Sequence, residues 1–375
     1  MKQLLAYCLS IILCVSFTGC MENYLDLYPE DKITSASFPE NESDIKLLLN
    51  GVYAQLREKE VYNQGLFGFG ITDGATPNAF NWGTDEVFNK LGAGRLSSSD
   101  GGVVTYRWKR CYEIISRANY LLACMDLVDL SEEAKAKYSG ETHFLRGLAY
   151  SVLAETYGGV PIILTDISTE EARSLKRASL EETWQQALDD YEVAITNLGV
   201  DAPEPGRATK GAALGMKMRA YLYQGKYKEV LSCVEQIDAL KKYGLFHSYE
   251  GLFDPANENN KEVLFDIQYI EGENSQGSYI DQYCGTGTES WTRGSRYVPT
   301  DDLVAAYETI DGSPVDPENP YENRDPRLGF TAVLPGSYFL GYRFPNYLYP
   351  GGAFNHAGNR LKHLSTRKYR IQDES

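Results

Sequence analysis

Apolar residues recur at helical spacing through most of the first 240 residues, and this periodicity predicts a mainly α-helical chain. In the first such stretch, Ile45 is followed at intervals of three, four, seven, eight and eleven residues by apolar side chains, namely Leu48, Leu49, Val52, Tyr53 and Leu56. This spacing places them on one face of a helix, which must be buried against neighbouring elements. The same argument predicts further helices over about 104–126, 131–157, 179–198, 209–224 and 226–241.

The last two predicted helices resemble a tetratricopeptide hairpin, in which two short helices are joined by a glycine. Tyr221, Gly225 and Tyr227 have the Y-x3-G-x-Y spacing of that motif. The glycine permits a tight turn, and the two tyrosines are predicted to fill the groove between the helices. Because one pair cannot bury its faces alone, we expect neighbouring helix pairs to stack into an α-α superhelix.

Two long segments break the helical periodicity. Residues 59–103 are dense in Gly, Asn, Asp, Ser and Phe, and residues 271–298 are rich in Gly, Ser and Tyr. Loops of this length in compact domains tend to carry function as well as connect elements. Beside the second segment, Val263–Ile270 alternates as a strand would, and Asp301–Thr309 is predicted to be helical.

The N-terminal segment has the pattern of a lipoprotein signal peptide. Lys2 precedes an apolar run over 4–17, which is too short for a comfortable transmembrane helix. The run leads into Thr18-Gly19-Cys20, where small residues before a cysteine look like a lipobox. The pattern predicts cleavage before Cys20 and its lipidation, and the alternative is an ordinary secretory signal with a chance cysteine. Several acyl chains would anchor the protein firmly.

Charge and cysteine usage narrow the class of protein. The formal net charge is −16, and an acidic chain lacks the basic surface that binds nucleic acid, so no nucleic-acid partner is expected. Outside the N-terminal segment the cysteines show neither CxxC nor zinc-site spacing. They are predicted to be small buried apolar residues, namely Cys111, Cys124, Cys233 and Cys284.

The sequence carries none of the common catalytic signatures. It has no G-x-S-x-G elbow, no HExxH and no phosphate-binding G-x4-G-K-[ST]. Its four histidines are scattered. Carboxylates are too numerous to single out a glycosidase pair, whose separation is defined only in space. A binding protein is therefore favoured over an enzyme, and no cofactor or metal is predicted.

An ordered set of short motifs runs along nearly the whole chain. They are Leu25-Asp26-Leu27-Tyr28-Pro29 after the lipobox, Leu48-Leu49-Asn50-Gly51-Val52-Tyr53, Trp108 to Leu122, Glu141 to Tyr150, Tyr157-Gly158-Gly159-Val160-Pro161, the helix pair around Tyr221–Tyr227, Asn260 to Phe265, Leu303 to Gly312 and Asn323 to Leu328. In this order they resemble the SusD/RagB glycan-binding lipoproteins of Bacteroidetes.

The resemblance implies a fold of tetratricopeptide-like helix pairs with long irregular loops and a few short strands. It implies a lipid-anchored protein on the cell surface at the outer membrane. Such a protein binds an oligo- or polysaccharide and hands it to a TonB-dependent (SusC-like) transporter. Two alternatives remain for the function. One is a peptide- or protein-binding scaffold subunit of the transporter, and the other is a glycan-cleaving enzyme.

The resemblance also bears on domain organisation. Residues 1–19 are expected to be the signal peptide and 20–375 a single domain, with a helical part over about 20–242 and a loop-rich part over about 243–375. Family members usually continue well past the segment around Lys368-Tyr369. The resemblance therefore implies that C-terminal helices are lacking, in a chain that is either truncated or naturally short.

The ligand residues are expected on two loops, 67–95 and 275–296. An indole face stacks on a sugar ring, whereas Asn, Asp and Arg side chains hydrogen-bond its hydroxyls. The candidates are Asp73, Asn78, Asn81 and Trp82 on the first loop and Tyr279, Tyr283, Trp291 and Arg293 on the second. Four helix residues are instead assigned to packing and buried hydrogen bonding, namely Trp108, Tyr112, Asn119 and Arg146.

Overall fold

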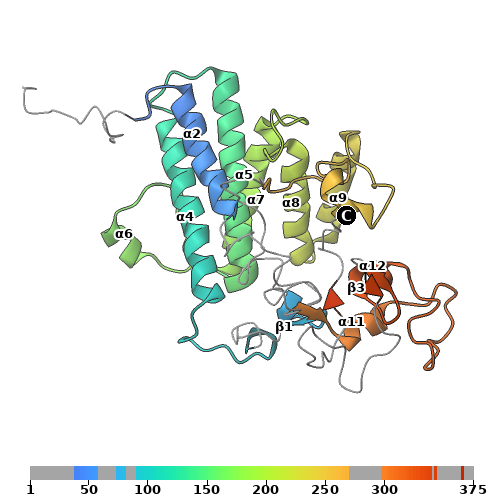
Figure 1. Cartoon of the computed structure of the whole chain (residues 1–375). Coiled ribbons are helices and arrows are strands. Elements are labelled where there is room, and N and C mark those ends of the chain that lie inside the picture. The colour runs from blue at the N-terminus through green and yellow to red at the C-terminus, as the bar shows by residue number, and fades with distance from the viewer. Residues whose placement is uncertain are drawn as a thin grey trace, which may run out of the picture.

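The computed structural model describes residues 38–57, 73–81, 90–269, 297–339, 342–343 and 365–366. This part of the chain is mainly helical, as predicted. Its long helices stand side by side (Figure 1) and are α2 (Glu42–Tyr53), α4 (Val103–Cys124), α5 (Glu132–Tyr157), α7 (Leu180–Asn197), α8 (Lys210–Tyr223) and α9 (Tyr227–Ala239).

Helices that follow one another in the chain pack against one another. α4 contacts α5, α5 contacts α7, α7 contacts α8 and α8 contacts α9, while α2 lies against α4 and α5. The colours of Figure 1 show that the helices follow one another across the stack in chain order. The predicted stack of helix pairs is therefore confirmed.

The helix starts follow from capping side chains. At α7, the Ser179 hydroxyl accepts from the Glu182 N–H (3.1 Å) and the Glu182 carboxylate accepts from the Ser179 N–H (2.7 Å), which forms a capping box. Asn41 and Asp44 make the same reciprocal pair at α2. Such caps stabilise a helix by about 1 kcal/mol.

The hairpin between α8 and α9 forms, but its two tyrosines, Tyr221 and Tyr227, differ in burial. Gly225 has φ +69°, the left-handed conformation that glycine adopts without strain, as the motif predicted. Tyr221 is half-buried and packs on the core. Tyr227, however, is 66% exposed, so its predicted place in the groove is wrong. The buried side chains of the pair include the small residues Ala220 and Cys233, which leave little room for a ring between the helices.

A buried ion pair ties the middle of the stack together. Arg146 on α5 donates from Nε and Nη2 to the carboxylate of Asp190 on α7, with a shortest distance of 2.7 Å. Its Nη1 donates to Asn119 Oδ1 on α4 (2.8 Å), and Asn119 Nδ2 donates to the carbonyl of Ile163 (3.0 Å). The predicted structural roles of Asn119 and Arg146 are confirmed.

The segment after α5 is held by aromatic packing and a close backbone approach. Tyr112 donates to the carbonyl of Pro161 (2.7 Å), and its ring centroid lies 5.0 Å from that of Trp108. A Cβ on Gly159 would stand 2.0 Å from the carbonyl oxygen of Ala178. Only glycine fits there, so the Gly159 position and the two aromatic side chains are structural.

Short elements complete the described chain. The helical ones are η1 (Ala54–Arg57), α6 (Thr169–Ser174), η3 (Gly251–Phe253), η4 (Pro255–Asn257), α11 (Asp301–Ala306) and α12 (Arg327–Thr331). The strands are β1 (Ala79–Asn81), β2 (Tyr297–Pro299), β3 (Ala332–Val333), β4 (Tyr338–Phe339), β5 (Tyr342–Arg343) and β6 (Ser365–Thr366). They form two-stranded antiparallel ladders, β1 with β2, β3 with β6 and β4 with β5.

Two predictions beyond α9 need correction. The predicted strand Val263–Ile270 does not form over its described part, 263–269, which is extended but pairs with no strand among the described residues. The alternating pattern is present, but a strand also needs a partner. The predicted helix Asp301–Thr309 ends earlier, at Ala306.

Of the predicted buried cysteines, Cys111, Cys124 and Cys233 are buried and free, which confirms their role as packing residues. Cys284 lies outside the described residues, as do Cys20 and the predicted signal segment. Within the described ranges, no helix combines the length and apolar character needed to cross a bilayer.

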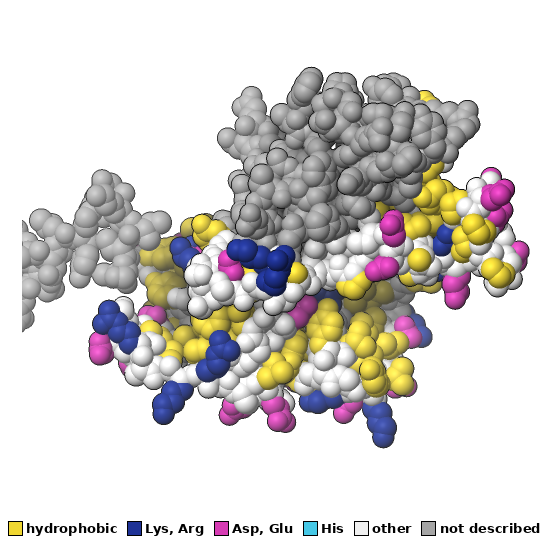
Figure 2. Space-filling model, turned by 90° about the horizontal axis from the view of Figure 1, so that it is seen from below, with side chains coloured by type: hydrophobic (Ala, Val, Ile, Leu, Met, Phe, Trp, Pro, Cys, Tyr) yellow, Lys and Arg dark blue, Asp and Glu magenta, His cyan; other side chains and the backbone are white. Residues whose placement is uncertain are grey.

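The stack ends on a helix with an apolar outer face. Several large apolar side chains at this end are exposed, namely Leu222, Tyr223, Tyr227 and Leu231. Seen from below, the described surface shows apolar side chains gathered between scattered charged ones (Figure 2). Terminal repeats of helical stacks usually present a polar outer face, and α9 adds the exposed apolar side chains of Tyr227, Leu231 and Val234 to its polar ones.

Candidate functional site

The ladder of β1 and β2 pairs residues 79–81, within the first loop on which ligand residues were predicted, with residues 297–299, which directly follow the second. Asn81, at the end of β1, is paired with Tyr297, at the start of β2. Because the strands are antiparallel, these two positions share one end of the ladder. The rest of loop 67–95 continues from Asn81, and loop 275–296 leads directly into Tyr297. Both therefore start from adjacent backbone positions, below the helices in Figure 1.

Thr300 fastens this ladder to its surroundings. Its N–H donates to the carbonyl of Asn78 (3.0 Å), and its hydroxyl donates to the carbonyl of Pro77. The same hydroxyl accepts from the N–H of Leu303 (3.1 Å) and so caps α11. One side chain thus links the turn before β1, the end of β2 and the start of α11.

The described candidates on the first loop have partly structural roles. The carbonyl of Asp73 accepts from the N–H and hydroxyl of Thr76, at 2.9 Å and 2.7 Å, which closes a turn. Asn78 supplies a carbonyl to Thr300, and Asn81 supplies backbone to the ladder. The side chains of Asp73 and Asn78 are exposed. The other candidates lie outside the described residues and stay predictions, namely Trp82, Tyr279, Tyr283, Trp291 and Arg293.

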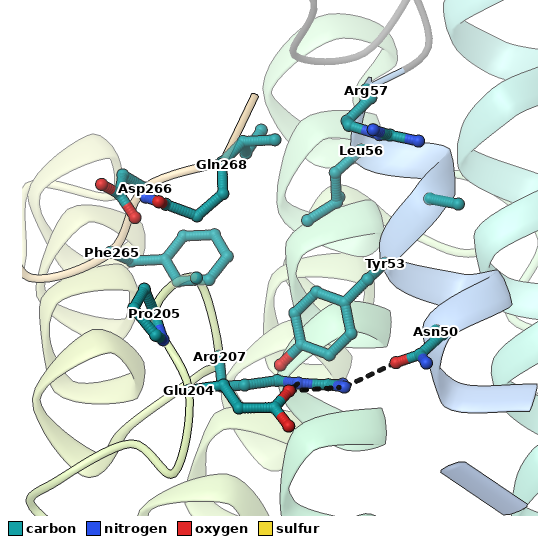
Figure 3. A pocket seen from close by; sticks show the side chains of 13 residues that line it. Asn50, Tyr53, Leu56, Arg57, Glu204, Pro205, Arg207, Phe265, Asp266 and Gln268 are labelled. Atoms are coloured by element: carbon teal, nitrogen blue, oxygen red, sulfur yellow. Dashed lines mark hydrogen bonds and ion pairs between the residues drawn. The ribbon is translucent and has the colours of Figure 1, made fainter. Parts of the chain in front are cut away.

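A hollow of about 280 Å³ lies between the end of α2, the turn 204–207 and the extended segment 265–268 (Figure 3). Tyr53 and Phe265 stand on opposite sides of it, and Arg207 and Glu204 lie at one end. An adjoining hollow of about 300 Å³ shares the turn 204–207 and Phe265 with the first.

The buried carboxylate of Glu141 anchors the turn 204–207 through Tyr53 and Arg207. Tyr53 donates to Glu141 Oε2 (2.7 Å) and accepts from the N–H of Ala208 (2.9 Å). Arg207 Nη1 lies 3.5 Å from the same Glu141 oxygen, and the guanidinium stands 4.9 Å from the centroid of the Tyr53 ring. Arg207 Nη2 also donates to Asn50 Oδ1 (2.5 Å). This network fixes the positions of Asn50, Tyr53 and Arg207, which line the hollow.

Burial governs the protonation of this network. Desolvation raises the pKa of the Glu141 carboxyl, while the hydrogen bond from Tyr53 and the charge of Arg207 oppose that rise. Desolvation, followed by the neighbouring Glu141 charge, raises the pKa of Tyr53 well above its ordinary value. Tyr53 therefore keeps its proton near neutral pH and acts as a hydrogen-bond donor to Glu141.

No pattern in the sequence indicated this hollow. Its walls come from residues near 50, 205 and 266, and only the folded stack brings these segments together. The turn 204–207 lies between two predicted helices, and the segment around Phe265 was predicted as a strand. Aromatic rings with paired donors and acceptors suit noncovalent binding. No cluster that could hold a metal ion occurs among the residues described by the structure.

Comparison with known families assigns the chain. A SusD-like family described as "starch-binding associating with outer membrane" matches residues 23–222, which is more than half of the chain, and the SusD family model SusD_RagB matches residues 261–373. The chain belongs to the SusD family. The fold and the resemblance predicted from the sequence are thereby confirmed.

Similar proteins occur in Formosa agariphila and Bacteroides ovatus. The SusD-like protein P25 of Formosa agariphila is 26% identical over 294 residues, which are 74% of this chain and 54% of that protein. A SusD-like protein of Bacteroides ovatus is 23% identical over 278 residues, covering 68% of this chain and 48% of that one. The chain thus spans about half the length of these relatives.

Solved structures of the family share the fold. A SusD-like carbohydrate-binding protein from Bacteroides fragilis superposes with a TM-score of 0.78 at 26% identity, over 89% of this chain and 68% of that one. A laminarin-binding SusD-like protein superposes with a TM-score of 0.65 at 20% identity, over 87% of this chain and 77% of that one. The second similarity concerns the fold alone.

Proposed function

We propose that this protein is a cell-surface lipoprotein, anchored through Cys20 at the outer membrane, that binds an oligo- or polysaccharide without cleaving it. In this proposal it delivers the glycan to a TonB-dependent, SusC-like transporter. Membership of the SusD family and the carbohydrate-binding and laminarin-binding descriptions of similar proteins support the ligand class.

The single structural observation behind the proposed site is the β1–β2 ladder. It joins the two loops that were chosen from sequence for their Trp, Tyr, Asn and Arg content, although they are far apart in the chain. In the proposal, the indoles of Trp82 and Trp291 stack on sugar rings, and Asp73, Asn78, Asn81 and Arg293 hydrogen-bond hydroxyls. Tyr279 and Tyr283 add further aromatic faces with hydroxyl groups.

A glycan array probed with the detergent-solubilised chain tests the proposal. We expect selected glycans to be retained and their chain lengths to stay unchanged. Trp82→Ala or Trp291→Ala should weaken binding about tenfold, since stacking contributes about 1 kcal/mol or more at a buried ring. Circular dichroism should be unchanged in both variants.

Other outcomes discriminate between the alternatives. A folded protein that retains no glycan but is captured with the transporter would favour the peptide- or protein-binding scaffold. Shortened glycan products would favour the cleaving enzyme. Full affinity in both tryptophan variants would exclude the two loops as the binding site.

A further inference from the structure

The hollow beside α2 has the size and shape of a small-molecule site. Its volume of about 280 Å³ lies near the lower end of the range for ligand pockets, roughly 300 to 1,000 Å³. The Tyr53 ring from α2 and the Phe265 ring from the extended segment stand on opposite sides of it (Figure 3). A flat ligand with apolar faces and polar edges fits between such rings.

The polar groups around the hollow offer both donors and acceptors. Asn50 uses its amide oxygen to accept from Arg207, which leaves the amide NH₂ as a donor. The carboxylate of Asp266 makes no hydrogen bond or ion pair with any described residue, although it lines the hollow. Gln268 makes only long contacts to Asn259, at 3.3 Å and 3.4 Å.

Arg207 shapes one end of the hollow and is committed to the protein. Its side chain is 11% exposed, and the buried Nη1 lies within ion-pair distance of Glu141. Nη2 donates to Asn50. The free polar groups on the walls are therefore those of Asn50 and Asp266.

The hollow is lined by charges of both signs. Arg57 and Arg207 carry guanidinium groups, Glu204 and Asp266 carry carboxylates, and Glu204 is also paired with Lys46, so neither an anion nor a cation is strongly favoured. A neutral ligand avoids repulsion from charges of either sign. Hydroxyl groups donate and accept at once, which matches the mixture of groups on the walls.

We propose that this hollow is a second carbohydrate site, which takes one neutral sugar residue, either free or at the end of a chain. None of the residues that line it belongs to the loops 67–95 and 275–296, so failure at one site can be told apart from failure at the other. The Tyr53 and Phe265 rings contact the sugar from opposite sides, while Asp266 and Asn50 bind its hydroxyls.

The test titrates the detergent-solubilised full chain with methyl glycosides of glucose, galactose, mannose and N-acetylglucosamine, followed by saturation-transfer NMR. Two variants address the hollow. Asp266→Ala removes the free acceptor, and Ala54→Trp fills the space from the end of α2. Asp238→Ala is the matched control, because Asp238 is exposed on α9, away from the hollow. Trp82→Ala reports on the loop site.

We expect at least one glycoside to bind, with affinity reduced about tenfold by Asp266→Ala and abolished by Ala54→Trp. Asp238→Ala and Trp82→Ala should leave that affinity unchanged. Three results would overturn the proposal. The first is no binding of any glycoside up to about 50 mM. The second is binding that survives both hollow variants, and the third is binding that is lost in Trp82→Ala.

Discussion

Arg146 illustrates how one buried charge can connect three helices. Its guanidinium reaches Asp190 on α7 and Asn119 on α4, and the side chains of the ion pair are 7% and 1% exposed. A buried pair adds little net stability compared with apolar packing, but the loss of one partner leaves an uncompensated charge. The helical spacing in the sequence indicated that Arg146 and Asn119 were structural. It could not identify Asp190, because that contact depends on how α5 and α7 cross.

Removal of Asp190 should therefore destabilise the protein strongly. We expect Asp190→Ala to lower the free energy of unfolding by about 3–5 kcal/mol, since Arg146 would stay buried with only Asn119 as partner. Urea denaturation followed by circular dichroism measures this change.

Asp126→Ala is a suitable control for Asp190→Ala. It breaks an ion pair with Lys135 in which the side chains of Asp126 and Lys135 are 71% and 45% exposed. Such pairs contribute at most about 1 kcal/mol. Equal losses in the two variants would contradict a special role for the buried pair.

At the scale of elements, periodicity predicted the long helices and failed for short strands. α7 was recognised because its turns repeat one apolar face and it begins with a capping residue, whereas α5 begins with a capping residue but is buried on all sides over Phe144–Ala154. β1 spans only Ala79–Asn81, too few residues to show alternation, and its partner lies far along the chain. The segment 263–269 shows the reverse case, an alternating pattern without a partner strand.

The site was predicted only in part for the same reason. The two loops were chosen from their composition, and the sequence held no sign that β1 and β2 would join them. The hollow beside α2 was missed altogether, because Asn50, Glu204 and Asp266 belong to segments with unrelated patterns.

Thr300 offers a way to test whether the β1–β2 ladder positions the two loops. Thr300→Val keeps the shape of the side chain and removes its hydroxyl, which should loosen both the Pro77 contact and the cap of α11. On the proposed function, glycan affinity should fall roughly fivefold, equivalent to about 1 kcal/mol, the value of a typical cap. Thr300→Ser, which retains the hydroxyl, should restore it.

A second helix cap provides the control for Thr300. Thr209 caps α8 through the Ala212 N–H (3.1 Å) and lies outside the ladder. Thr209→Val should reduce stability while glycan affinity stays at the wild-type value. If Thr300→Val binds glycan as the wild type does, the ladder does not position the loops. If the wild type binds no glycan at all, the proposed function itself fails.

At the scale of the whole molecule, the proposed attachment to the membrane rests on Cys20. Cys20→Ala should move the protein from the membrane fraction to the soluble fraction of cells, because acyl chains supply about 0.8 kcal/mol per buried methylene. Immunoblots of the two fractions measure the shift. Cys14→Ala, within the apolar run, should leave the distribution unchanged, and membrane retention of Cys20→Ala would contradict lipid anchoring.

The contact between Thr300 and Pro77 spans 223 residues of sequence. Contacts between such distant segments form late, since a long loop must close before they can stabilise anything. The helical stack is built from neighbours in the chain, whereas β1 has no partner strand until residue 297 has been synthesised. A chain interrupted midway could therefore form the contacts between successive helices but not the ladder of β1 and β2.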